Sequence, residues 1–372
     1  MKHTRSPVMI LAGGTGGHVF PALAVAKEIE KQGVPIVWVG TRKGIESKIV
    51  TQAGYRLECI LVSGLRGKGM ATYLTAPIKL TIAGLQAAWL LLKYRPCAVL
   101  GMGGFVAGPV GLMAVLLRRP LIIHEQNAIA GLTNRILAPF AKRILTGFPS
   151  TFVRKNVEVV GNPVRTEISQ IRRDFTSDSI DKPIRVLVIG GSLGAQAFNQ
   201  IVPAALAQIS VDERPEVWHQ TGEHKLQFTQ DNYKKFGVEA RVDAFIEAMY
   251  EAYTWADLVI CRAGAITVAE LAVVGVGAIF VPYPYAVDDH QTANASVLTN
   301  AGAAFLIQEH ELNAAVLAKQ LGEISAHRSK LRSIAEAVRG FAKPQAAEDV
   351  AKICLQTCLE KTNGDVGLAK DF

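Results

Sequence analysis

The stretch LAGGTGGHVFP, residues 11–21, holds four glycines within five residues and continues the apolar run of residues 8–12. A helical pattern follows over about 19–31, with apolar residues recurring on one face until Gly33. A strand, a glycine-rich turn and a helix N-terminus together attract anions, because the first N–H groups of a helix lack partners within it and its dipole is positive there. The stretch therefore predicts an α/β unit with an anion site at its first turn.

A second glycine loop of the same kind begins the other half of the chain. IRVLVIGGSLGA, residues 184–195, is again an apolar run, a glycine turn and the start of a helical pattern. The polar, mixed-charge segment after GNPVR, residues 161–165, is typical of a linker. Besides the run that opens the second motif, the expected strands are residues 8–12, 36–40, 57–61, 98–101, 121–124, 143–146, 157–160, 217–220, 240–245, 258–261, 278–281 and 304–307. Strands that alternate with helical patterns predict two α/β domains with parallel sheets.

Neither glycine loop fits the common nucleotide fingerprints. A dinucleotide loop needs GxGxxG and an acidic residue at the end of the second strand, but Val19 takes the third glycine position and that strand ends in Gly40 and Thr41. Ser192 interrupts the pattern in the second loop, and neither loop has the lysine of a Walker motif. Two loops at the carboxyl ends of two sheets indicate two phosphate-bearing substrates across a cleft, as in sugar transfer from a nucleotide donor to a separate acceptor.

The composition is that of a globular enzyme with anionic partners. The 372 residues carry a net charge of +8, and no basic stripe interleaved with aromatic residues points to nucleic acid. Five cysteines without a CxxC pair are expected to be reduced thiols, and no signal peptide is expected. The apolar segment 80–92 is too short to span a membrane, and glycines interrupt segment 98–117, which predicts a soluble protein.

Seven sequence blocks occur in one order over nearly the whole chain. They are GGTGGHVFP (13–21), GMGGFVAGP (101–109), HEQNAIAG (124–131), GNPVR (161–165), GGSLGA (190–195), CRAGAITVAEL (261–271) and DDHQTANA (288–295). Together they resemble the MurG family of bacterial peptidoglycan glycosyltransferases. The resemblance implies inverting, metal-independent transfer of N-acetylglucosamine (GlcNAc) from UDP-GlcNAc to lipid I, the undecaprenyl-pyrophosphoryl-MurNAc-pentapeptide, which gives lipid II. It also implies a GT-B fold of two Rossmann-like domains facing a central cleft. Residues 1–163, joined by the C-terminal helix at about 342–372, would bind acceptor and membrane, and residues 164–341 would bind UDP-GlcNAc.

The resemblance carries donor-site roles onto individual residues. Glu270 would accept hydrogen bonds from both ribose hydroxyls, Gln291 would contact the sugar, and Ile246 would present its backbone to uracil. Amides of the second glycine loop, and the N-terminus of a helix from about Gly264, would stabilise the departing pyrophosphate in place of a metal. The complete expected donor set is Thr15, Gly16, Gly17, Asn127, Arg165, Ser192, Ile246, Ala265, Ile266, Thr267, Val268, Ala269, Glu270 and Gln291. For Glu270 the alternative is a capping box with Thr267, in which the carboxylate only satisfies its own helix.

The first domain would supply the acceptor site. His18 is the candidate general base for the MurNAc 4-hydroxyl, since a helix N-terminus favours neutral imidazole. The alternative is that His18 caps its helix or bonds a loop carbonyl. Gly14, Gly103 and Gly104 would offer amides to the lipid-linked pyrophosphate, although close packing of helix on strand would explain the same glycines.

Two further questions concern metal and membrane. Asp288 and Asp289 precede His290, but adjacent acids point apart, so no metal site is expected. Basic residues surround the apolar segments of the first half: Arg66, Lys68, Lys79, Lys93, Arg118, Arg119, Lys142 and Arg143. They favour peripheral binding of an anionic membrane, which the resemblance places at the cytoplasmic face of the inner membrane, with cell-wall or division proteins as further partners. The alternative is a solvated basic face beside a core helix.

Two other functions stay open at this point. A UDP-GlcNAc 2-epimerase, or a GT-B transferase with a soluble acceptor, would share the donor half but would lack the second loop of the first domain and the basic apolar patch. A non-enzymatic protein that binds anionic membranes or nucleic acid is the alternative from a different class.

Overall fold

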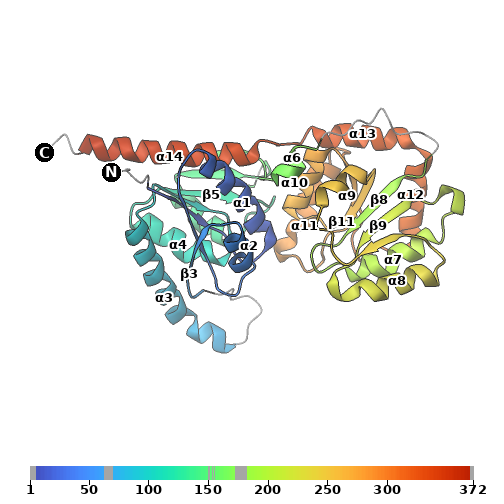
Figure 1. The fold of residues 1–372 in the computed structure, drawn as a ribbon, viewed down its shortest axis with the longest axis horizontal. Coiled ribbons are helices and arrows are strands. Elements are labelled where there is room, and N and C mark those ends of the chain that lie inside the picture. Colours follow the sequence, from blue (N-terminus) through green and yellow to red (C-terminus); the bar gives the residue numbers. More distant parts are fainter. Residues whose placement is uncertain are drawn as a thin grey trace. The chain divides into compact units, whose positions relative to one another are not determined.

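The computed structural model describes residues 6–62, 70–149, 151–152, 154, 156–171 and 182–368. The chain forms two compact units: unit 1 comprises Met1–Arg165 and Pro344–Phe372, and unit 2 comprises Thr166–Lys343. These boundaries fall two residues after the predicted ones (165 against 163, 343 against 341). The C-terminal segment belongs to unit 1 (Figure 1), as the GT-B resemblance implies.

Unit 1 is built on a seven-stranded parallel sheet in the order β3-β2-β1-β4-β5-β6-β7. Its strands are β1 (Val8–Leu11), β2 (Ile36–Gly40), β3 (Arg56–Cys59), β4 (Ala98–Gly101), β5 (Leu121–Glu125), β6 (Arg143–Thr146) and β7 (Val157–Val159). Its helices are α1 (Gly16–Lys31), α2 (Glu46–Gln52), α3 (Met70–Tyr94), α4 (Gly104–Leu116), α5 (Leu132–Leu137), the 3-10 helix η1 (Ala138–Phe140) and α14 (Ala346–Leu368).

Unit 2 holds a six-stranded parallel sheet in the order β10-β9-β8-β11-β12-β13. Its strands are β8 (Arg185–Ile189), β9 (Glu216–Gln220), β10 (Arg241–Asp243), β11 (Leu258–Cys261), β12 (Gly277–Phe280) and β13 (Phe305–Leu306). Its helices are α6 (Thr166–Ser169), α7 (Gln196–Leu206), α8 (Leu226–Lys235), α9 (Met249–Trp255), α10 (Ala265–Val274), α11 (His290–Thr299), α12 (Ala314–Ala326) and α13 (Arg328–Arg339), with 3-10 helices η2 (Val211–Glu213), η3 (Glu223–Lys225) and η4 (Val287–Asp289).

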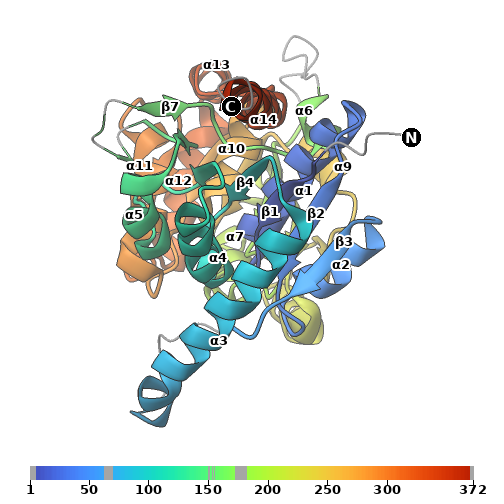
Figure 2. The ribbon, with the colours of Figure 1, turned by 90° about the vertical axis from the view of Figure 1, so that its left-hand side faces the viewer.

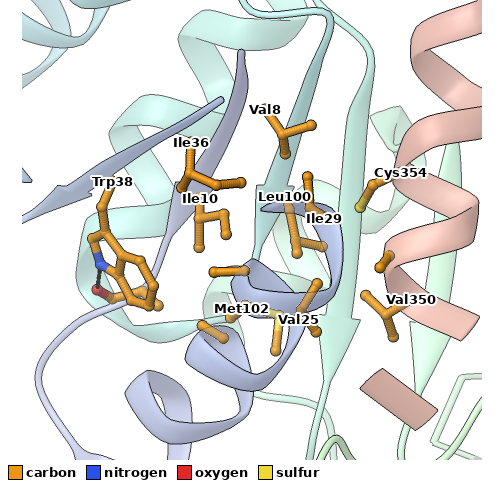
Figure 3. Packing of buried hydrophobic residues seen from close by; sticks show 14 of the residues in the cluster. Val8, Ile10, Val25, Ile29, Ile36, Trp38, Leu100, Met102, Val350 and Cys354 are labelled. Carbon is orange, nitrogen blue, oxygen red and sulfur yellow. Dashed lines mark hydrogen bonds between the residues drawn. The ribbon is translucent and has the colours of Figure 1, made fainter. Parts of the chain in front are cut away.

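Helices cover both faces of the unit 1 sheet, so its central strands β1 and β4 have no polar side chain at any position. Alternate residues of β1 serve opposite faces: Val8 and Ile10 pack with α1 and α14, whereas Met9 and Leu11 pack with α3 and α4. Figure 3 shows Val350 of α14 beside the α1 side chains in this cluster. The Trp38 indole N–H donates to the Ala12 carbonyl at 2.8 Å (Figure 3), which satisfies the one polar group of that side chain.

The expectation of reduced cysteines is wrong for one pair. Cys97, at the start of β4, forms a disulfide with Cys358 of α14, 261 residues away in sequence. The two cysteines meet because α14 packs on unit 1. The spacing of cysteines along the chain does not predict this pairing. Cys59, Cys261 and Cys354 are free thiols.

Helix α3 is longer than its apolar segment suggested. It runs for 25 residues, includes Pro77, and extends its N-terminal end beyond the rest of unit 1 (Figure 2). Across the described residues, no helix combines the length and apolar character needed to cross a membrane. Segment 98–117 is the predicted strand, glycine turn and helix, as β4 and α4.

Candidate active site

Each sheet has one topological switch point, where the strand order reverses beside its first strand. The switch lies between β1 and β4 in unit 1 and between β8 and β11 in unit 2. Open parallel sheets bind ligands outside the carboxyl ends of their strands at such points. The loops that leave these four strands are the two glycine loops of unit 1, the loop 190–195 and the turn into α10. The segments singled out in the sequence therefore gather at the two switch points.

His18 lies between the two glycine loops of unit 1. A Cβ atom added to Gly103 would approach His18 Nε2 at 3.1 Å, and one added to Gly104 would approach Nδ1 at 3.5 Å. Both glycines have positive φ, +91° and +76°, so a side chain would also strain the backbone. Thr15 Oγ1 lies 3.2 Å from His18 Nδ1. If Nδ1–H donates to this hydroxyl, Nε2 keeps the lone pair that a general base needs.

The buried carboxylate of Glu46, which the sequence analysis missed, supports the first glycine loop from inside. Glu46 is 0% exposed and accepts the Gly14 N–H at 3.1 Å, the Thr41 N–H at 2.9 Å and the Thr41 hydroxyl at 2.8 Å. A Cβ on Gly13 would lie 2.6 Å from Glu46 Oε1, so glycine is needed there for packing. Because Gly14 donates inward, the predicted pyrophosphate contact of its amide competes with Glu46. The first intrahelical hydrogen bonds of α1 are donated by His18 and Val19. The Gly16 and Gly17 N–H groups come before them and are therefore better placed than the Gly14 N–H to bind an anion.

We expect Glu46→Gln to disturb the first glycine loop, which the resemblance assigns to the acceptor. The amide keeps one acceptor for Thr41 but turns its NH₂ group toward the Gly14 N–H, which leaves a partly buried donor unpaired at about 1–3 kcal/mol. The melting temperature should fall, and so should kcat/KM for the acceptor that the resemblance implies. Glu30→Gln, which alters an exposed carboxylate bonded to the Tyr55 hydroxyl, is the control. An unchanged melting temperature and an unchanged acceptor kcat/KM in Glu46→Gln would contradict the assignment.

Asn127 is oriented by a second buried carboxylate. Glu125, at the end of β5, accepts from Asn127 N–H at 3.1 Å and Nδ2 at 3.2 Å, and from Asn134 Nδ2 at 2.9 Å. The neighbouring His124 is 0% exposed, its Nε2 lies 2.9 Å from the Gly161 carbonyl, and burial lowers its pKa to about 4. His124 is therefore a neutral structural residue, and His18 is the histidine placed at the glycine loops.

Glu270 does not form a capping box. Helix α10 begins at Ala265 after Gly264, so Thr267 is its third residue and not the cap. The Glu270 carboxylate is 5% exposed and accepts a hydrogen bond from the Tyr253 hydroxyl of α9 at 3.0 Å. The alternative interpretation is thus wrong because the helix starts three residues earlier than that motif requires. Tyr253 fixes the carboxylate at the helix that begins at the switch point of unit 2.

Gln291 is held by its carbonyl oxygen. Gln291 Oε1 accepts the Ala263 N–H at 3.2 Å and the Tyr283 N–H at 2.9 Å. Because the oxygen is used in this way, we expect the Nε2 group of Gln291 to make any contact with a sugar hydroxyl. Asp288 and Asp289 both have left-handed φ values, 53° and 49°. In the described part of the chain, no three His, Cys, Asp or Glu side chains gather as metal ligands would.

The remaining predicted residues fall on both units. Ser192 is exposed on its glycine loop, and residues 265–269 form the first turns of α10. Ile246 is buried, and its N–H donates to Gln220 Oε1 at 3.2 Å, so a uracil contact through that N–H would compete with Gln220. Thr15, Gly16, Gly17, Asn127 and Arg165 belong to unit 1. The contact of these five with the donor stays a prediction.

Two parallel-sheet units, each with a glycine loop at its switch point, and a C-terminal helix that belongs to the first unit, form a GT-B fold. Residues 8–146 match the glycosyltransferase family 28 N-terminal domain, and residues 185–350 match the glycosyltransferase family 28 C-terminal domain. The chain belongs to glycosyltransferase family 28.

Curated relatives cover almost the whole chain. A protein of Alkalilimnicola ehrlichii is 53% identical over 351 residues, which is 94% of this chain and 98% of the relative. A protein of Azotobacter vinelandii is 50% identical over 354 residues, with the same two shares. Both are named UDP-N-acetylglucosamine–N-acetylmuramyl-(pentapeptide) pyrophosphoryl-undecaprenol N-acetylglucosamine transferase.

Solved structures separate the family from the wider fold. MurG of Acinetobacter baumannii has a TM-score of 0.81 at 39% identity and covers 94% of this chain and 99% of its own. A UDP-GlcNAc 2-epimerase of Neisseria meningitidis reaches a TM-score of 0.66 at 11% identity, with 95% and 99% covered. At that identity the epimerase shares the fold alone.

Proposed function

We propose that this protein transfers GlcNAc from UDP-GlcNAc to the MurNAc 4-hydroxyl of lipid I, forming lipid II and UDP. The relatives at about half identity over 94% of the chain carry this name, and that observation is the main support. His18 would take the proton of the attacking hydroxyl while the new bond forms at the anomeric carbon and the bond to UDP breaks. Glu270 and the backbone near Ile246 would hold the uridine.

The departing diphosphate would be stabilised without a metal. The N-termini of α7 and α10 leave the carboxyl ends of β8 and β11 at the switch point of unit 2. The N–H groups of a first helical turn, together with the helix dipole, favour the charge that develops on the leaving group. Oriented amides would thus do what a divalent cation does in other transferases.

The direct test is transfer of labelled GlcNAc from UDP-GlcNAc to a lipid I analogue, with and without a chelator. Equal product in both reactions supports the proposal. Product that disappears with chelator and returns with a divalent cation would overturn the metal-free mechanism while leaving the transferase activity intact. Conversion of UDP-GlcNAc without acceptor would point instead to an epimerase.

Unit 1 would also bind the membrane that carries the acceptor. Five apolar side chains of α3 are 40–68% exposed and recur at intervals of three and four residues, which places them on one face: Ile78, Ile82, Leu85, Trp89 and Leu92. Lys93 stacks on the Trp89 ring at 4.3 Å. Further exposed apolar side chains lie on α4, α5 and η1: Leu112, Leu116, Leu132, Ile136 and Phe140. An apolar stripe with flanking lysines is what an anionic bilayer surface binds.

The basic residues expected around this stripe differ in their surroundings. Arg66 and Lys68 lie outside the described residues. Lys142 and Arg143 form ion pairs with Glu360 of α14, at 2.6 Å and 3.3 Å, so their charge is partly neutralised within unit 1. Lys79 and Lys93 of α3 accompany the stripe, and Lys93 also forms an ion pair with Glu58 at 3.6 Å.

We expect Leu85→Ser to weaken binding to anionic liposomes by about tenfold, since burying one leucine contributes about 1.5–3 kcal/mol. Lys79→Gln should weaken it less, because one basic residue near an anionic surface contributes about 1 kcal/mol. Flotation with vesicles of stated anionic content measures both. Val211→Ser, at a residue 77% exposed in unit 2, is the control. Equal flotation of all variants would exclude this face of α3 as the membrane-binding surface.

A further inference from the structure

The end of β9 and the segment after it, residues 220–225, bind carbonyl groups of the glycine loop 190–195, which is expected to hold the diphosphate in unit 2. Gln220 Nε2 donates to the Gly191 carbonyl at 2.9 Å. Lys225 Nζ donates to the carbonyls of Leu193 at 3.0 Å and Gly194 at 3.3 Å. Three carbonyls of one short loop are therefore bound by donors from the same neighbouring segment.

Holding a carbonyl also sets the direction of an amide. In a trans peptide, the C=O of one residue and the N–H of the next point in opposite directions, and the described chain contains no cis peptide. With the Gly191 carbonyl turned toward Gln220, the Ser192 N–H points away from it. Ser192 is the residue expected to contact the diphosphate. Gln220 thus determines which way that amide faces without touching the ligand.

The other end of the Gln220 side chain reaches the segment expected to bind uracil. Its Oε1 accepts the Ile246 N–H at 3.2 Å, and both residues are 4% exposed. Backbone bonds run beside this contact, from Thr221 N–H to the Asp243 carbonyl and from Gly222 N–H to the Ala244 carbonyl, each at 3.0 Å. One buried amide therefore joins the base segment to the phosphate loop.

We propose that Gln220 is a positioning residue that couples the uridine and diphosphate subsites. This inference rests on the proposed binding of UDP-GlcNAc. The affinity of a ligand that contacts only the uracil-binding segment does not depend on the loop. The affinity of UDP is highest when the loop amides are already oriented toward its diphosphate. Gln220 should therefore matter more for UDP than for uridine or UMP.

The test is titration of the full chain with uridine, UMP and UDP by calorimetry. Gln220→Met has the same length and loses both hydrogen bonds, and Gln220→Glu keeps the acceptor for Ile246 but loses the donor to Gly191. In both, the ratio of UDP affinity to UMP affinity should fall by about tenfold, as for a polar contact whose loss leaves a buried group unpaired. In Gln220→Glu the uridine affinity should stay within about twofold of the wild type, because a carboxylate still accepts the Ile246 N–H. Gln227→Met, on the exposed face of α8, is the matched control.

Lys225→Gln tests the same loop at a half-buried side chain outside the hydrophobic core. It should also lower the UDP to UMP ratio, and Lys235→Gln should not. An unchanged ratio in the Gln220 variants, or an equal loss for uridine, UMP and UDP, would reduce Gln220 to a structural residue and overturn the inference. Failure of the wild type to bind UDP would instead refute the proposed function.

Discussion

Replacing His18 with alanine is expected to lower kcat for GlcNAc transfer by about 10²- to 10⁴-fold, the contribution of a positioned general base. The Kd of UDP should change far less than kcat, because Glu270 and the α10 turn, which are expected to hold the uridine and the diphosphate, belong to unit 2, whereas His18 belongs to unit 1. Steady-state rates with a lipid I analogue and a separate UDP titration measure the two quantities.

Two variants separate chemistry from packing at His18. The ring lies against Gly103 and Gly104, so His18→Gln, which retains bulk but cannot act as a base, should be nearly as inactive as His18→Ala. His310→Ala removes an imidazole that is 80% exposed in unit 2 and should have wild-type activity. Near-normal turnover of His18→Ala would refute the assignment of the base.

Substitution of Glu270 by alanine is expected to weaken UDP binding by at least about 10²-fold. Hydrogen bonds to a charged group contribute about 1.5–3 kcal/mol each, and the buried carboxylate is expected to accept two from the ribose. The Tyr253 hydroxyl, 3.0 Å from the carboxylate and 1% exposed as a residue, would also lose its acceptor. Calorimetric titration with UDP gives the affinity.

If Glu270 binds the ribose hydroxyls, the affinity should also depend on the 2′-hydroxyl of the ligand. The wild type should bind 2′-deoxy-UDP more weakly than UDP, and Glu270→Ala should bind the two alike. Glu336→Gln, which removes an exposed ion pair with Arg332 on α13, is the control. If the variant still binds UDP more tightly than 2′-deoxy-UDP, the Glu270 carboxylate does not bind the ribose 2′-hydroxyl.

The resemblance and the glycine loops predicted the place of the site better than its internal bonding. His18, Ser192 and Glu270 all lie at or beside the switch points of their sheets, because the glycine loops mark the carboxyl ends of β1, β4 and β8. Glu46 and Gln220, which orient two of those loops, and Glu125, which orients Asn127, were missed. Glu46 meets Gly14 across 32 residues of sequence, and Gln220 meets Gly191 across 29. No local pattern distinguishes such a residue from any other polar side chain near a strand end.

Helix boundaries were also predicted only in part from the sequence. Glycine and the apolar period predicted α1 and α4, whereas α3 exceeded its apolar segment because polar and proline residues before it continue the helix. The capping-box interpretation of Thr267 failed because α10 begins at Ala265.

By itself, the sequence determined the class of fold and the order of its strands and helices, since apolar periodicity and glycine turns act between near neighbours in the chain. Only the tertiary structure decided that α14 closes onto β4 through Cys97 and Cys358, and that the Gly14 amide faces Glu46 and not solvent. Those outcomes depend on which distant groups meet once the sheets have formed, and a buried donor takes whichever acceptor the packing places beside it.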